Sequence, residues 1–206
     1  MTLDPHRLPE TCKYLASLPQ GLESFPRCTV RDVALDAYVR DFSGLAGEPG
    51  LPGPVADLLR GSLQGTWVSE TVFQVANLVV RDLAFATDAA FSEWIFDANT
   101  ELFDKPLLRS LMRLLSPMLI VIGASRRWGT FHQGSDLVAG RVARSGEREE
   151  ASARLRYPAG LFAPLFLSSL EQVFLAALDA SRAKDPRVEL GAVAPTEAEY
   201  KVSWRA

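Results

Sequence analysis

Apolar residues in the N-terminal part of the chain recur three or four positions apart, the spacing of an amphipathic helix. The predicted helices span residues 9–18, 31–42, 55–63, 68–86, 88–102 and 105–128. Four glycines and three prolines between positions 44 and 54 predict an exposed loop. Pro117 should kink or divide the last helix, because proline supplies no amide hydrogen.

The last third of the chain changes from helical spacing to strict alternation of apolar and polar residues, which is typical of half-buried strands. The predicted strands are residues 137–144, 150–157, 188–194 and 199–205. A helix over residues 164–184 separates the two pairs. We therefore predict an α+β fold: a helical N-terminal half, residues 1–134, followed by a ββαββ antiparallel-sheet module, residues 135–206, with one long helix packed on the sheet. The two parts are expected to form one compact unit.

One predicted helix, residues 68–86, is apolar on most of its circumference. Its polar residues Glu70, Gln74, Asn77 and Arg81 are spaced 4, 3 and 4 apart and form a single stripe. We interpret this stripe as the solvent face of a core helix. The alternative is that it forms one wall of a polar pocket.

Charge narrows the range of partners. The 206 residues carry a formal net charge of −3, so the general electrostatic attraction to nucleic acid or anionic membrane is missing, although a local basic patch stays open. No nucleic-acid partner is expected. The most apolar stretch, residues 118–124, is far shorter than the roughly 20 residues that span a bilayer. The N-terminus lacks the pattern of a signal peptide, and we expect a cytoplasmic protein.

The two cysteines, Cys12 and Cys28, have no metal-ligand spacing and no neighbouring histidine cluster. We expect free thiols in a reducing compartment, with a disulfide between them as the less favoured alternative. No metal site is predicted.

The order of the predicted elements resembles the superfamily of bacterial four-vinyl-reductase-type and heme-nitric-oxide-binding domains, and a related myxobacterial family of similar length. The passages that carry the resemblance are Arg126-Arg127-Trp128, Arg154-Leu-Arg-Tyr157, Leu170-Glu-Gln-Val-Phe174 and Tyr200-Lys-Val-Ser-Trp204. This resemblance implies small-molecule or lipid sensing and protein interaction more often than catalysis.

The chain departs from the superfamily at its cofactor sites. Heme-binding members use a Tyr-x-Ser-x-Arg pattern, whereas here Tyr157 is followed by Pro-Ala-Gly-Leu161. Metal-binding relatives place cysteines in the C-terminal part, where this chain has none. Neither heme nor an iron–sulfur cluster is therefore expected, and no cofactor is predicted.

Candidate site residues are few. His132 lies in a predicted loop bounded by glycines, where a ligand could reach it. Large aromatic side chains of the helical half could line an apolar ligand cavity, and the alternative is that they belong to the core. The predicted ligand-binding residues are Trp67, Phe73, Phe91, Trp94, Trp128 and His132.

Three functions fit these features. The first is a non-catalytic module of the bacterial sensor type that responds to an apolar small molecule or binds a protein partner, with signalling as its role. The second is a cofactor-free biosynthetic enzyme, such as a cyclase or isomerase, with acid–base chemistry from His132, Glu93 or Asp97. The third is a structural adaptor that forms homo-oligomers through the 44–54 loop and its sheet edges.

Overall fold

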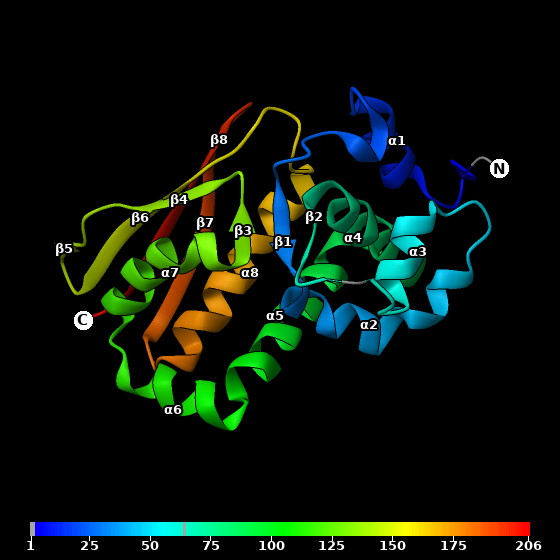
Figure 1. Cartoon of the computed structure of the whole chain (residues 1–206). Helices are drawn as coiled ribbons and strands as arrows, with labels where there is room; N and C mark the ends of the chain where they lie inside the picture. The colour runs from blue at the N-terminus through cyan, green and yellow to red at the C-terminus, as the bar shows by residue number, and fades with distance from the viewer. Residues whose placement is uncertain (1–2, 64) are drawn as a thin grey trace. The chain divides into compact units, whose positions relative to one another are not determined.

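The computed structural model describes residues 3–63 and 65–206 and has the α+β fold that the sequence predicts (Figure 1). Contacts divide the chain into two compact units. The first unit contains Met1–Ala90, Thr130–Gly134 and Pro158–Phe166, and the second contains Phe91–Gly129, Ser135–Tyr157 and Leu167–Ala206. This grouping differs from the predicted division at residue 134, because three helices of the helical half group with the sheet.

The first unit combines four helices with a small antiparallel sheet. Its helices are α1 (Pro9–Ser17), α2 (Asp36–Phe42), α3 (Gly53–Leu59) and α4 (Glu70–Ala84), with short 3₁₀ helices at Gly21–Glu23, Asp32–Leu35 and Ser43–Gly47. Its strands are β1 (Thr29–Arg31), β2 (Trp67–Ser69) and β3 (His132–Gln133), in the order β2-β1-β3. The sequence did not predict these strands, because two or three residues are too few to show alternation.

Helix α4 is the centre of the first unit. Every residue from Glu70 to Val80 is buried, so the helix is enclosed on all sides over that length. Ser69 caps its start, with Oγ accepting from the amide of Val72 at 3.5 Å. The last residues of β2 therefore lead directly into a helix whose polar and apolar side chains alike lie inside the protein.

The second unit contains α5 (Asp88–Asp104), which begins in the first unit, then α6 (Pro106–Leu114) and α7 (Pro117–Phe131), which ends in it. Pro117 divides the predicted 105–128 helix as expected: α6 ends at Leu114 and Pro117 opens α7. Helix α8 (Pro164–Ala180) also starts in the first unit and continues into the second.

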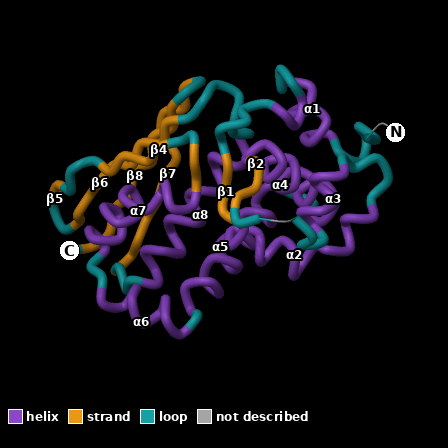
Figure 2. The backbone as a smooth tube through the Cα atoms, in the orientation of Figure 1, coloured by secondary structure: helices purple, strands orange, loops and turns teal. Residues whose placement is uncertain are grey.

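The sheet of the second unit is antiparallel throughout, and Figure 2 shows its strands side by side. The strands are β4 (Asp136–Ala139), β5 (Ala143–Ser145), β6 (Arg148–Arg156), β7 (Lys184–Ala194) and β8 (Glu197–Arg205), in the order β4-β6-β8-β7 with β5 also paired to β6. The predicted first strand is thus interrupted at Gly140, where a β-carbon would lie 2.4 Å from Oγ of Ser152. Apart from this break, the ββαββ order is confirmed.

Helices α7 and α8 cover the same face of this sheet. Ile120 and Val121 from α7, Leu178 from α8 and Trp204 from β8 belong to one buried cluster, which Met112 of α6 joins. The remaining buried members are Ala151 and Val202. This shared core is the physical reason that α6 and α7 group with the sheet.

Candidate functional site

The polar stripe of α4 is buried. Glu70 is 1% exposed, Gln74 0% and Asn77 3%. Our interpretation of this stripe as a solvent face is wrong for these three residues, because other segments of the first unit cover them. Only Arg81, the last member, is partly exposed, and it pairs with Asp88 at 2.6 Å.

Glu70 and His132 form the centre of the buried network. Oε2 of Glu70 lies 3.0 Å from Nδ1 of His132, and Oε1 accepts a hydrogen bond from Nε2 of Gln74 at 3.1 Å. The carboxylate favours a proton on Nδ1 of the ring, which places the lone pair of the neutral imidazole on Nε2. A buried carboxylate is thus satisfied at both oxygens, as its desolvation requires.

Backbone pairing brings these two residues together from positions 62 apart. His132 pairs with Val30 in the sheet, which places β3 beside β1. The amide of Glu70 donates to the carbonyl oxygen of Cys28 at 2.9 Å, just before β1. The small sheet therefore holds the histidine against the first turn of α4.

The charge of Glu70 contributes to the raised pKa of two further groups, Tyr14 and Cys28. The phenol of Tyr14, in α1, donates to the carbonyl oxygen of Leu161 at 2.5 Å, and its pKa is raised by burial first and by Glu70 second. Burial, followed by Glu70, also raises the pKa of the Cys28 thiol. Cys28 therefore stays a thiol at neutral pH and is a poor nucleophile. Both cysteines are free, as the sequence predicts.

Gln74 and Asn77 extend the network along α4. Oε1 of Gln74 accepts from the amide of Ala163 at 3.4 Å, which ties α4 to the 158–166 segment. Oδ1 of Asn77 accepts from the phenol of Tyr38 at 2.5 Å, and its Nδ2 donates to the carbonyl oxygen of Phe73 at 2.8 Å. The stripe thus connects α4 to three other parts of the first unit.

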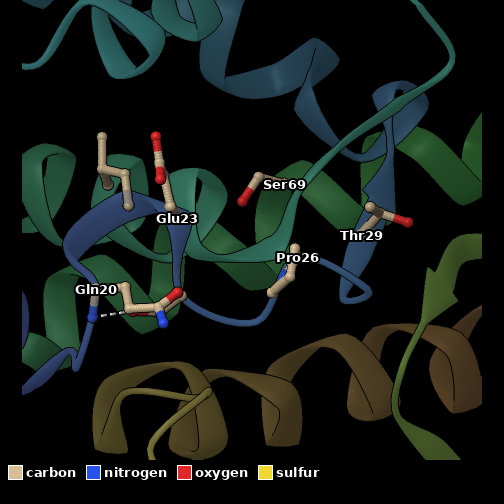
Figure 3. Close-up of a pocket in the computed structure, with 7 residues that line it drawn as sticks. Gln20, Glu23, Pro26, Thr29 and Ser69 are labelled. Atoms are coloured by element: carbon tan, nitrogen blue, oxygen red, sulfur yellow. Dashed lines mark hydrogen bonds between the residues drawn. The ribbon is translucent and has the colours of Figure 1, made fainter.

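A hollow of about 460 Å³ opens beside the start of α4 (Figure 3). It is lined by Gln20, Leu22, Glu23, Ser24, Pro26, Thr29 and Ser69. The carbonyl oxygen of Ser24 accepts from the hydroxyl of Thr71 at 2.8 Å, and the hydroxyl of Thr29 donates to Oε1 of Gln133 at 3.1 Å. The walls of the hollow are therefore bonded to α4 and to β3, the two elements that carry Glu70 and His132.

The predicted ligand-binding residues divide between the two units. In the first unit, the rings of Phe73 and His132 both contact the ring of Phe166. The centroid distances to Phe166 are 6.2 Å for Phe73 and 6.5 Å for His132. Trp67 is half-buried in β2, with the guanidinium of Arg31 5.8 Å from its ring. Neither the hollow beside α4 nor the small void under α7 and α8 is lined by a residue of the predicted set.

The other three predicted aromatics lie in the second unit. Phe91 and Trp94 contact each other on α5, with centroids 5.8 Å apart, and Trp128 donates from Nε1 to the hydroxyl of Ser135 at 3.0 Å. Phe91 and Trp128 are buried and contribute to packing. A role in ligand binding stays a prediction for all six residues.

The acid–base residues of the enzyme hypothesis are also separated. Glu93 and Asp97 are exposed on α5 in the second unit, whereas His132 belongs to the first. The acidic partner of His132 is Glu70, which sequence reasoning did not select. Its signal was present, because a polar stripe on a helix that is apolar everywhere else indicates buried polar groups as well as a solvent face.

Within residues 3–63 and 65–206, no group of three or more His, Cys, Asp or Glu side chains is arranged to hold a metal ion. In the same residues, no helix combines the length and the apolar character needed to cross a bilayer. Comparison of the chain with protein-family models, with curated proteins and with solved structures finds no match.

Proposed function

We propose that the protein is a small-molecule-responsive module of the bacterial sensor type, which acts in the cytoplasm and binds its ligand in the hollow beside α4. The observation that carries this proposal is the bonding of the walls of the hollow to the elements that hold Glu70 and His132. A ligand that shifts these walls also shifts the buried pair.

The lining of the hollow defines the class of ligand. Its volume of about 460 Å³ is within the usual range of small-molecule sites, roughly 300–1,000 Å³. Leu22 and Pro26 supply apolar surface, while Ser69 supplies a hydroxyl and Glu23 a carboxylate. This combination suits a small amphipathic molecule that is neutral or positively charged, with hydrogen-bonding groups at one end.

The buried pair gives the response its cooperativity. Ser69 lines the hollow and is followed directly by Glu70, so displacement of the helix cap changes the position of the carboxylate. A buried carboxylate that loses its partners costs several kcal/mol. The first turn of α4 and β3 are therefore expected to move together between discrete arrangements, as a switching element requires.

The family resemblance supports the same class of function. The resemblance rests on a helical front followed by ββαββ elements; the folded chain adds the short strands β1, β2 and β3 and divides the first predicted strand into β4 and β5. The superfamily implies sensing of small molecules or lipids, which we extend to this protein as part of the proposal.

The proposal is tested by ligand-observed NMR with a library of small amphipathic fragments, and by native mass spectrometry for a copurifying molecule. Leu22→Trp narrows the hollow, and Val33→Trp, at an exposed apolar position outside it, is the matched control. We expect fragments that bind wild type and Val33→Trp but not Leu22→Trp. Fragment binding that Leu22→Trp leaves unchanged, or no binding at all, would overturn the proposal.

A second candidate, acid–base catalysis, is favoured by the contact between Glu70 and His132. A carboxylate that fixes the tautomer of a histidine is the arrangement by which enzymes prepare a general base. We propose testing it with a panel of isomerase and cyclase substrates. Turnover that His132→Gln abolishes and Glu70→Gln reduces would support catalysis, and turnover indifferent to both substitutions would exclude this pair.

A further inference from the structure

The corner between α6 and α7 in the second unit combines exposed apolar side chains with positive charge. Leu114 is 82% exposed, Met118 42% and Leu119 46%. Leu114 ends α6, and the other two lie in the first turn of α7. Seven large hydrophobic side chains are exposed among the described residues, and three of them meet at this corner.

The segment that forms this corner carries basic residues and no acidic ones. From residue 105 to residue 135 the chain contains no aspartate or glutamate. The same segment contains the basic residues Lys105, Arg109, Arg113, Arg126 and Arg127. Although the whole chain has a net charge of −3, positive charge is concentrated on two consecutive helices. This is the local basic patch that the net charge alone did not exclude.

The exposed residues of α6 share one face. Arg109, Arg113 and Leu114 are exposed, whereas Met112 is buried in the core of the unit. The exposed face of α6 therefore continues into the corner. On α7, Leu119 and Arg126 are seven residues apart and lie on a common face. Arg109 and Arg113 thus lie on the exposed face of α6 that leads to the corner, whereas Arg126 lies about two turns from it along α7.

The acids nearest in the chain are Glu101 and Asp104, at the end of α5. Arg109 lies 3.6 Å from Asp104, at the end of α5, in a pair that is about half exposed on both sides. An exposed pair of this kind contributes little and is screened by salt. Five basic residues against Glu101 and Asp104 leave a net positive charge over the end of α5, α6 and α7.

We propose that the α6–α7 corner is a docking surface for an anionic lipid membrane. Basic residues attract anionic headgroups, and apolar side chains beside them enter the boundary between headgroups and acyl chains. The apolar residues form an exposed corner between two helices and not a groove. A bilayer accepts such a corner without a complementary shape, which a protein partner would have to supply. With helices this short, the protein lies on the membrane and does not cross it.

Vesicle co-sedimentation tests the proposal with the full chain. We expect binding to phosphatidylcholine vesicles that contain phosphatidylglycerol, little binding to phosphatidylcholine alone, and loss of binding as salt is raised. Absence of binding to the anionic vesicles would overturn the proposal. This holds also if the surface binds an acidic protein instead.

Two pairs of variants separate the apolar and the charged contributions. Leu114→Ser should weaken binding roughly tenfold, whereas Val193→Ser, at an apolar residue of β7 that is 53% exposed, should not. Arg113→Gln should weaken binding about fivefold, and Arg144→Gln on β5 is its control. Thermal unfolding by circular dichroism checks that each variant is folded. Equal binding of Leu114→Ser and Val193→Ser would also refute the proposal.

Discussion

Helix α4 buries three polar side chains, whereas the corner between α6 and α7 exposes three large apolar ones. Both segments are amphipathic in sequence, but α4 buries its polar residues together with its apolar ones, and the corner exposes apolar residues together with polar ones. In α4 the burial of polar groups depends on hydrogen-bond partners. Every buried polar group of Glu70, Gln74 and Asn77 that the structure describes has a hydrogen bond. At the corner Leu114, Met118 and Leu119 are exposed, while Leu115 between them packs against the core.

The buried polar residues of α4 and the exposed apolar residues of the corner have different physical costs. Burial of a carboxylate is favourable only while its partners are in place, so α4 is sensitive to small changes. Exposed apolar residues cost little in the folded state, but they make a surface that binds. One region is therefore expected to control stability and the other association.

The largest expected effect is at Glu70. Glu70→Ala removes the partner of His132 and of Gln74 and should lower the free energy of unfolding by about 3–5 kcal/mol, measured in urea. Glu93→Ala on the exposed side of α5 is the matched control and should stay within about 0.5 kcal/mol of wild type. Equal stability of the two variants would show that the buried pair is not a stabilising contact.

The next effect concerns the other end of the stripe. Tyr38→Phe removes the hydroxyl that donates to Asn77 and leaves that amide oxygen without this donor. We expect a loss of about 1–3 kcal/mol in urea unfolding. A loss below about 0.5 kcal/mol would mean that the buried oxygen finds another donor.

Alkaline pH should weaken the first unit through two of its phenols. Burial raises the pKa of Tyr14 and Tyr38 in the folded state, so above a pH of about 10 the unfolded chain releases their protons first. Their stabilising contribution is complete below that pH and is lost as pH rises, by up to about 1.4 kcal/mol per pH unit for each phenol. Urea unfolding measured across this range should show a smaller slope for Tyr14→Phe combined with Tyr38→Phe. An unchanged slope would contradict the prediction.

The smallest effect is expected at the corner. Leu114→Ala should change the free energy of unfolding by no more than about 0.5 kcal/mol, because the side chain is 82% exposed. The same substitution on α4, Leu78→Ala, where 3% is exposed, should cost about 2–5 kcal/mol. Similar losses at both positions, measured in urea, would remove the distinction between the two regions.

Much of the fold could be predicted from local pattern. The alternation in β6 and β8, the helical stripe of α8 and the break at Pro117 all appear in the structure. These features are predictable because the 3.6-residue and two-residue periods are properties of the backbone itself. The strands β1, β2 and β3 lacked such a pattern and form only because they pair with one another.

The candidate site could be predicted only in part. His132 was selected for its chemistry and for a predicted loop, which in the structure is the strand β3. The spacing of Glu70, Gln74 and Asn77 was visible, but nothing local connects positions 62 apart. The acid–base candidates Glu93 and Asp97 were chosen for their residue type alone, and the structure leaves them exposed on α5.

The sequence by itself determined the periods, and with them most of the helices, the C-terminal strands, the break at Pro117 and the α+β class. Tertiary structure alone decided that the stripe of α4 faces inward, that Glu70 meets His132, and that Leu114 stays outside. The physical reason is that a period is set by neighbours along the chain, whereas burial is set by whatever packs against a face. A polar stripe or an apolar one can therefore be assigned to solvent or core only when its surroundings are known.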